Sequence, residues 1–128
     1  MSLTNAFETS TLKYLLTTDS VTRPTAWYIG LFTSDPTDTG VAGTEVSGSG
    51  YARTVAAFTV TTDTASNSAS IEFPAASGGN WGTVGWIGIM DAASGGNMII
   101  HSALTVAKAI NDGDVFRIPT GDLDITAS

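Results

Sequence analysis

The sequence contains no cysteine. This absence excludes disulfide bonds, thiolate nucleophiles and cysteine-ligated zinc sites together. Basic residues are also scarce: 5 lysines and arginines stand against 12 aspartates and glutamates, for a formal net charge of -7. Binding to a nucleic-acid backbone or to an anionic membrane surface depends on clustered positive charge. We therefore expect neither nucleic acid nor a membrane among the partners of this chain.

Long hydrophobic runs are missing as well. No segment approaches the roughly 18 consecutive apolar residues that mark a membrane-spanning helix. The first ten residues, MSLTNAFETS, have neither the basic region nor the apolar region of a secretory signal. We expect the chain to fold in the cytoplasm of the cell that makes it.

Charged residues of both signs are few, at 13% of the chain, about half the usual share of a soluble domain. The polar character comes instead from serine, threonine, asparagine and glycine, whose uncharged surface is easily buried against a neighbour. At 128 residues the chain is long enough to form one domain, residues 1–128, without a metal or disulfide. The composition favours a subunit of an assembly, and we expect a homo-oligomer, a trimer being favoured.

The N-terminal segment has the pattern of a helix. Its apolar residues recur at spacings near three and four: Leu3, Ala6, Phe7, Leu12, Leu15 and Leu16. This predicts an amphipathic helix over residues 4–17, with Asn5 and Glu8 as a capping box and Thr4 as the alternative cap. Because a helix of about three turns is marginal alone in water, we expect it to dock on its own sheet or on a neighbouring subunit. Leu3, Phe7 and Leu12 are therefore candidate assembly residues.

The remainder, residues 25–127, is a series of short apolar segments separated by glycine, proline and aspartate turns. About eight strands are predicted, over residues 26–32, 51–62, 70–73, 81–90, 97–104, 106–110, 115–118 and 123–126. Ala56, Phe58 and Val60 are expected to face inward, and the glycines beside Trp86 predict a bulge or a close approach of another backbone. The fold class that results is mainly β: an antiparallel β-sandwich, jelly-roll or immunoglobulin-like, with one N-terminal α-helix.

Residues that could support catalysis are better explained by local structure. The one histidine, His101, has no G-x-S-x-G serine to activate, and a strand histidine whose ring nitrogens are bonded or exposed is favoured. A glycosidase carboxylate pair would come from the acids Asp35, Asp38, Glu45, Glu72 and Asp91. Most of these lie in turns, where the side chain bonds its own backbone. We expect no catalytic residues and no enzymatic activity.

Metal and ligand sites are weighed in the same way. Asp112, Asp114, Asp122 and Asp124 are the candidates for calcium, but they lack the EF-hand pattern, and turns and outward strand faces account for them. We expect no metal and no cofactor. Of the tryptophans, Trp27 and Trp86 lie in apolar strands and are expected in the core. Trp81 follows a glycine loop and is the candidate surface or interface residue.

Several segments resemble a known family. Residues 31–36 read LFTSDP, residues 43–53 read GTEVSGSGYAR, residues 81–84 read WGTV and residues 110–114 read INDGD. In this order they resemble small bacteriophage virion proteins commonly labelled tail-fibre or minor structural proteins. The resemblance spans nearly the whole chain, although Met90 stands where phenylalanine is usual.

The resemblance implies a virion component; it does not imply an enzyme and does not decide between head and tail. We expect a tail-fibre or tail-accessory subunit that works by protein–protein assembly with other virion proteins. A capsid decoration (cement) protein that stabilises the head shell is the alternative. A module that binds or hydrolyses host-surface glycans is a third reading, which calls for an exposed tryptophan near carboxylates. Glu45 and Arg53 flank the loop 48–50; we expect an ion pair between them to hold that loop in place, and both are candidate assembly residues.

Overall fold

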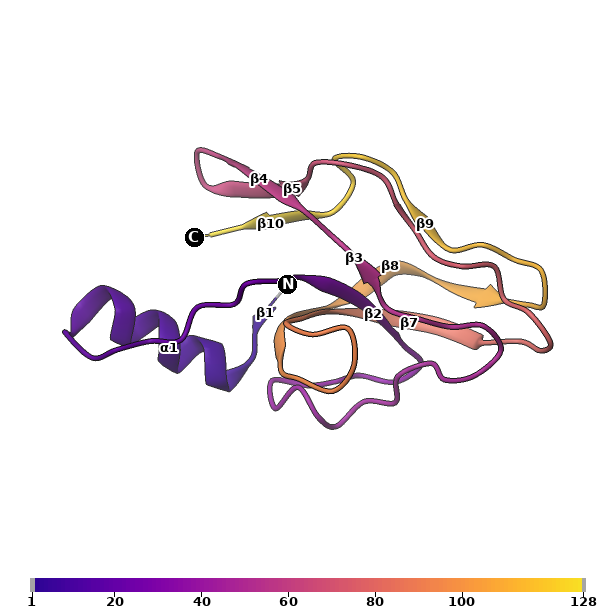
Figure 1. Ribbon diagram of the computed structural model, residues 1–128, viewed down its shortest axis with the longest axis horizontal. Coiled ribbons are helices and arrows are strands. Elements are labelled where there is room, and N and C mark those ends of the chain that lie inside the picture. The colour runs from indigo at the N-terminus through magenta and orange to yellow at the C-terminus, as the bar shows by residue number, and fades with distance from the viewer. Residues whose placement is uncertain (1, 128) are drawn as a thin grey trace.

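The computed structural model describes residues 2–127, and its elements form a mainly β fold with one helix (Figure 1). The N-terminal elements are β1 (Ser2–Leu3) and α1 (Asn5–Leu16). The strands that follow are β2 (Tyr28–Phe32), β3 (Thr54–Val55), β4 (Phe58–Thr61), β5 (Thr64–Asn67), β6 (Ile71–Glu72), β7 (Gly82–Met90), β8 (Met98–Ile110), β9 (Arg117–Ile118) and β10 (Asp124–Thr126). Among the described residues, no helix has the length and hydropathy required to span a membrane.

The strands pair antiparallel in three sheets. The largest has five strands in the order β1-β8-β7-β2-β3; a second has the order β10-β5-β4, and β6 pairs with β9. The three-stranded sheet lies opposite the five-stranded one, and α1 extends from one end of the molecule (Figure 1). The predicted fold class, an antiparallel β-sandwich with one N-terminal helix, is confirmed.

The core draws its residues from most of the chain. Ile29, Leu31, Phe73 and Val84 are almost completely buried in one large cluster that extends to Leu123. A smaller cluster, of Phe32, Met90 and Met98, occupies the other face of β2 and β7. Both faces of β2 are therefore covered, which explains why its sequence is apolar on successive residues instead of alternating.

The predicted bulge is present. The pairing of β7 with β8 changes register between Val84 and Trp86, at Gly85. Val84 faces Lys108 but Trp86 faces Ala103, so β8 has extra residues there, as a β-bulge requires. Residues 97–104 and 106–110 were predicted as two strands, but the structure has the single strand β8 (Met98–Ile110).

Other expectations about the strands are wrong in detail. The segment 51–62 is broken into β3 and β4, and β5 lies in a stretch where no strand was predicted. Val60, expected to face inward, is 72% exposed. The cause is that β4 pairs only with β5, in a narrow sheet that leaves part of its inner face uncovered.

The helix begins as predicted, and its N-cap is the alternative residue, Thr4. Thr4 is the N-cap residue, not Asn5, so the predicted capping box is wrong. Its hydroxyl makes no bond to the helix and instead donates to the carbonyl of Met98, at 2.7 Å. The Thr4 side chain thus bonds a distant strand instead of capping the helix.

Candidate assembly surface

The start of α1 is fastened to the end of the five-stranded sheet. The backbone amide of Thr4 donates to the Ile99 carbonyl at 3.0 Å, which extends the β1–β8 pairing by one residue. The amide of Asn5 donates to the Asp38 carbonyl at 2.8 Å. Leu3 and Phe7 are half-buried against the main core cluster. The first turn is thus well anchored, and these two predicted assembly residues contact their own body.

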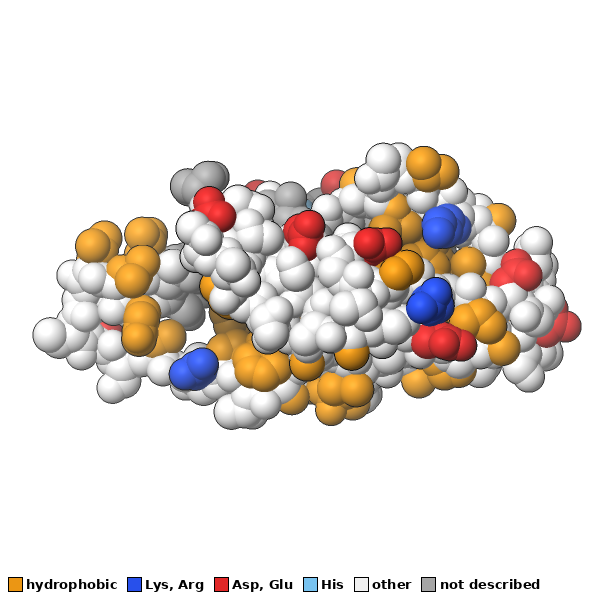
Figure 2. Space-filling model, turned by 90° about the horizontal axis from the view of Figure 1, so that it is seen from above, with side chains coloured by type: hydrophobic (Ala, Val, Ile, Leu, Met, Phe, Trp, Pro, Cys, Tyr) orange, Lys and Arg blue, Asp and Glu red, His pale blue; other side chains and the backbone are white. Residues whose placement is uncertain are grey.

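Beyond its first turn, α1 extends away from the two main sheets (Figure 1). None of its residues is buried, and Leu12, Leu15 and Leu16 are between 58% and 76% exposed. At about 100° per residue these three share one side of the helix, and Leu16 lies roughly 180° from Phe7. Figure 2 shows hydrophobic side chains gathered on the free end of α1. We call Leu12, Leu15 and Leu16 the leucine face.

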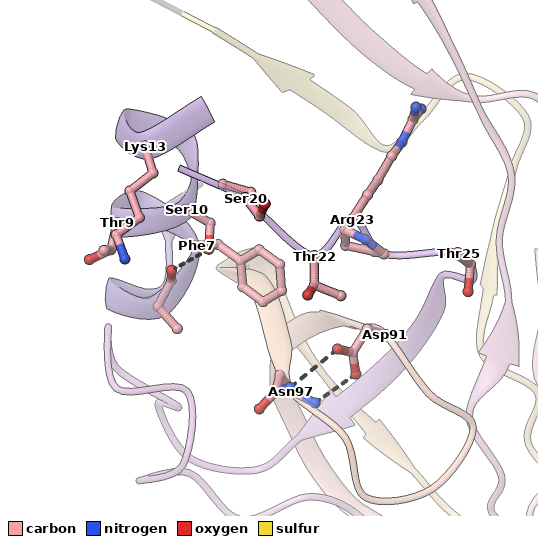
Figure 3. Close-up of a pocket in the computed structure, with 13 residues that line it drawn as sticks. Phe7, Thr9, Ser10, Lys13, Ser20, Thr22, Arg23, Thr25, Asp91 and Asn97 are labelled. Atoms are coloured by element: carbon pink, nitrogen blue, oxygen red, sulfur yellow. Dashed lines mark hydrogen bonds between the residues drawn. The ribbon is translucent and has the colours of Figure 1, made fainter. Parts of the chain in front are cut away.

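A pocket of about 490 Å³, with mixed polar and apolar lining, lies between α1 and the body. The helix, residues 20–25 and the β7–β8 connection line it, and the Phe7 ring points into it (Figure 3). Its acid, Asp91, accepts hydrogen bonds from the amide and the side chain of Asn97, at 2.7 Å and 3.3 Å. Arg23 points away from both residues (Figure 3). The Asp91 carboxylate is therefore engaged in closing the β7–β8 connection, which is a structural role.

The predicted ion pair between Glu45 and Arg53 is confirmed. The two Glu45 oxygens accept from Nε and Nη2 of Arg53, both at 2.8 Å, in a two-pronged arrangement. Arg53 Nη1 also donates to the carbonyls of Ala92 and Gly95, at 2.9 Å and 2.8 Å. One side chain therefore joins the loop that contains residues 48–50 to the β7–β8 connection.

Tyr51 is a third member of this network that the sequence did not reveal. Its hydroxyl donates to Glu45 at 2.6 Å and accepts from the Leu31 amide at 3.0 Å. Burial and the hydrogen bond to Glu45 raise the pKa of Tyr51. Burial alone would raise the pKa of Glu45, but bonds from Arg53 and Tyr51 and the arginine charge outweigh it, so this pKa is lowered. The carboxylate is thus ionised and fully engaged.

Trp81 does not lie on the surface. It is 6% exposed, its ring nitrogen donates to the Ser49 carbonyl at 2.9 Å, and its ring meets Tyr51 edge-on at 5.3 Å. The expectation of a surface tryptophan is therefore wrong: the glycine loop folds over the ring instead of leaving it exposed. Trp27 and Trp86 are half-buried and pack against the two core clusters, in agreement with their expected core positions.

The other candidate catalytic and metal residues are dispersed. His101 Nε2 lies 2.9 Å from Asp38 Oδ1 and ties a loop to β8. Asp35, Asp112 and Asp114 each accept a backbone amide in a turn or loop. Further carboxylates lie on strand positions: Glu72 opposite Arg117, and Asp124 bonded by Ser66. Within residues 2–127 no three histidines or acids converge as a metal site would require.

Two apolar hollows lie between the sheets, and no sequence pattern identified them. They measure about 370 Å³ and about 340 Å³. Both are lined by Val60, Ala65, Ile100 and Ile125, so they adjoin in one cleft. We call this the intersheet cleft. It lies between β8 and the strands β4, β5 and β10, which are far from β8 in the sequence, so local periodicity could not predict it.

Comparison with protein families gives one match. The family described as "Podophage GP4 fiber I protein gp80" matches residues 2–126. Comparison with curated proteins gives no match. The family match covers the anchored helix, the Glu45–Arg53 network and all three sheets, and it agrees with the resemblance to phage fibre and structural proteins. The chain therefore belongs to the family of the podophage GP4 fiber I protein gp80, a phage fibre family whose members are virion components.

Proposed function

We propose that this chain is a non-enzymatic structural subunit of a phage tail fibre, and that it assembles with other virion proteins through α1. The observation that carries the proposal is the uncovered leucine face on a helix whose first turn is firmly anchored. An isolated helix of this length is marginal in water. Full burial of a leucine stabilises by about 1.5–3 kcal/mol, so covering this face would stabilise both the helix and the assembly.

The rest of the molecule suits a packed subunit. Charged side chains are 13% of the chain, so little charge would have to be desolvated when subunits meet. The most elaborate polar group, Glu45 with Arg53 and Tyr51, fixes loops to one another. We propose a homo-oligomer, since symmetric assembly is the common way to repeat one contact, and a trimer is the state that we favour.

Two other functions have less support. A glycan-binding module calls for an exposed aromatic platform, whereas Trp81 is buried and Trp27 and Trp86 are half-buried. A decoration protein of the head shell would also use protein–protein contacts, but the matched family is one of fibre proteins. The fibre assignment is therefore the one we propose.

The test is incorporation into particles. Phage lacking the gene would be complemented with Leu16→Asp, with Val106→Asp as the control, because Val106 is also exposed and lies on β8, away from the helix. Quantitative mass spectrometry would measure the chain in purified particles. We expect Leu16→Asp to be depleted and Val106→Asp to be retained. Normal incorporation of Leu16→Asp would contradict assembly through α1.

A further inference from the structure

The intersheet cleft is an opening between the sheets that the chain does not fill with its own side chains. Its two hollows, of about 370 Å³ and about 340 Å³, share Val60, Ala65, Ile100 and Ile125. These four residues come from β4, β5, β8 and β10, so both sheets contribute to the walls. Apolar hollows of this size are typical of sites for small molecules, which occupy about 300–1,000 Å³.

One cation borders this apolar cleft. In the smaller hollow every lining residue is apolar except Arg23. Arg23 also borders the pocket between α1 and the body, but its side chain points away from Asp91 and Asn97 there (Figure 3). Arg23 is exposed, and the ion pairs within residues 2–127 do not include it. Its guanidinium is therefore available to an anionic group at the edge of the cleft.

The acid in the other hollow is already engaged. Asp63 borders the larger hollow, and one of its carboxylate oxygens accepts a hydrogen bond from the Thr64 hydroxyl at 3.2 Å. The two hollows therefore differ, because one carries a cation without a partner and the other an acid bonded within its own hairpin. A ligand with one negative group would be oriented with that group at Arg23.

The walls of the cleft favour an alkyl chain over a peptide strand. The four residues that both hollows share have aliphatic side chains and offer no side-chain hydrogen bond. A peptide strand between them would bury backbone N–H and C=O groups without partners, which is costly. An alkyl chain has no polar groups to satisfy, so it gains from burial without this cost.

We propose that the intersheet cleft binds a linear alkyl chain that ends in a carboxylate, as a fatty acid does. The alkyl chain lies between the sheets along Val60, Ala65 and Ile125, and the carboxylate lies at Arg23. A guanidinium recognises a carboxylate through its charge and its paired N–H donors. This ligand site does not involve the leucine face, and it goes beyond the proposed structural role.

The test is titration calorimetry of the purified chain with dodecanoate, below the concentration at which it forms micelles. We expect saturable binding that becomes about four times weaker for each methylene removed from the ligand. Arg23→Gln should weaken binding by about fivefold, the most that an exposed ion pair contributes. Dodecyltrimethylammonium has the same alkyl chain with a positive head group, and it should bind more weakly than dodecanoate.

Filling the cleft gives a matched pair of variants. Ala65→Leu enlarges a side chain in the wall that both hollows share, so it should abolish binding. Ala107→Leu makes the same change at an exposed position of β8 that does not line the cleft, and it should bind as wild type does. Urea denaturation without ligand shows whether each variant folds. If Ala65→Leu does not fold, Arg23→Gln still tests the proposal, because Arg23 is exposed on a connection outside the strands.

Three results would overturn the proposal. Dodecanoate that does not bind the wild-type chain would indicate that the cleft is covered by a protein instead. Binding by a folded Ala65→Leu that equals that of wild type would place the ligand elsewhere, for instance on the leucine face. Equal or tighter binding of dodecyltrimethylammonium, or no effect of Arg23→Gln, would show that the carboxylate is not recognised. None of these results concerns the fibre role, which is tested separately by incorporation into particles.

Discussion

Replacing Arg53 with alanine tests how the loops around the sheet are held. The substitution removes two hydrogen bonds to Glu45 and those to the carbonyls of Ala92 and Gly95. It also leaves the Glu45 carboxylate without its cation. The carbonyls belong to an exposed connection and can bond water instead, so most of the cost comes from the carboxylate.

The magnitude follows from burial. The side chains of Arg53 and Glu45 are 9% and 24% exposed, which places the pair between two limits. Exposed pairs contribute about 0.2–1 kcal/mol, and breaking a fully buried pair costs about 3–5 kcal/mol. We expect Arg53→Ala to lower the free energy of unfolding by about 2–3 kcal/mol, and Arg53→Lys by less, since lysine keeps the charge but not the two-pronged geometry.

Urea denaturation at pH 7 followed by tryptophan fluorescence is the assay, because Trp81 packs against Tyr51 beside the network. Arg117→Ala is the control: this exposed arginine bonds Ser70, and its loss should cost less than about 0.5 kcal/mol. If Arg53→Ala were as mild as Arg117→Ala, the conclusion that the network fixes the loops would be refuted.

Three further predictions concern the same body. The pKa of Glu45 is lowered in the folded chain relative to its usual value of 4.5. Wild type should therefore be more stable than Glu45→Gln above pH 4.5, and this difference in the free energy of unfolding should shrink as the pH falls below that value. A difference that is unchanged at pH 3 would contradict the prediction. Gly43→Ala should lower the free energy of unfolding by about 1–3 kcal/mol, because the new Cβ would lie 2.7 Å from the backbone carbonyl oxygen of Ser34. In Gly85→Ala the nearest contact of the new Cβ is at 4.0 Å, so thermal denaturation should show a smaller loss of stability. Trp81→Phe should cost at least about 1 kcal/mol through the lost bond to Ser49, and unchanged urea stability would argue against the buried position of this ring.

Local patterns in the sequence predicted the elements whose character is set locally. The helix, the apolar strands around Trp27 and Trp86, the bulge at Gly85 and the pair Glu45–Arg53 all follow from spacing or turn chemistry over short stretches. The antiparallel fold class was predicted from the regular spacing of short apolar segments and turn residues. These features need no knowledge of distant contacts.

Features that depend on distant contacts were missed or misplaced. Thr4 leaves its capping role for a bond to Met98, 94 residues away. Trp81 is covered by the loop carrying Ser49, and Val60 is exposed because its narrow sheet leaves an open cleft. In each case tertiary packing overrides a local preference. The uncovered part of the helix was equally beyond prediction, since periodicity shows an apolar face but not what covers it.

The measurement that tests the central claim most directly is immunogold electron microscopy of purified particles with an antibody against this chain. The account predicts gold confined to the tail fibres. Gold distributed over the head would contradict the fibre assignment and indicate a decoration protein. A chain that mass spectrometry does not detect in the particles at all would contradict any structural role in the virion.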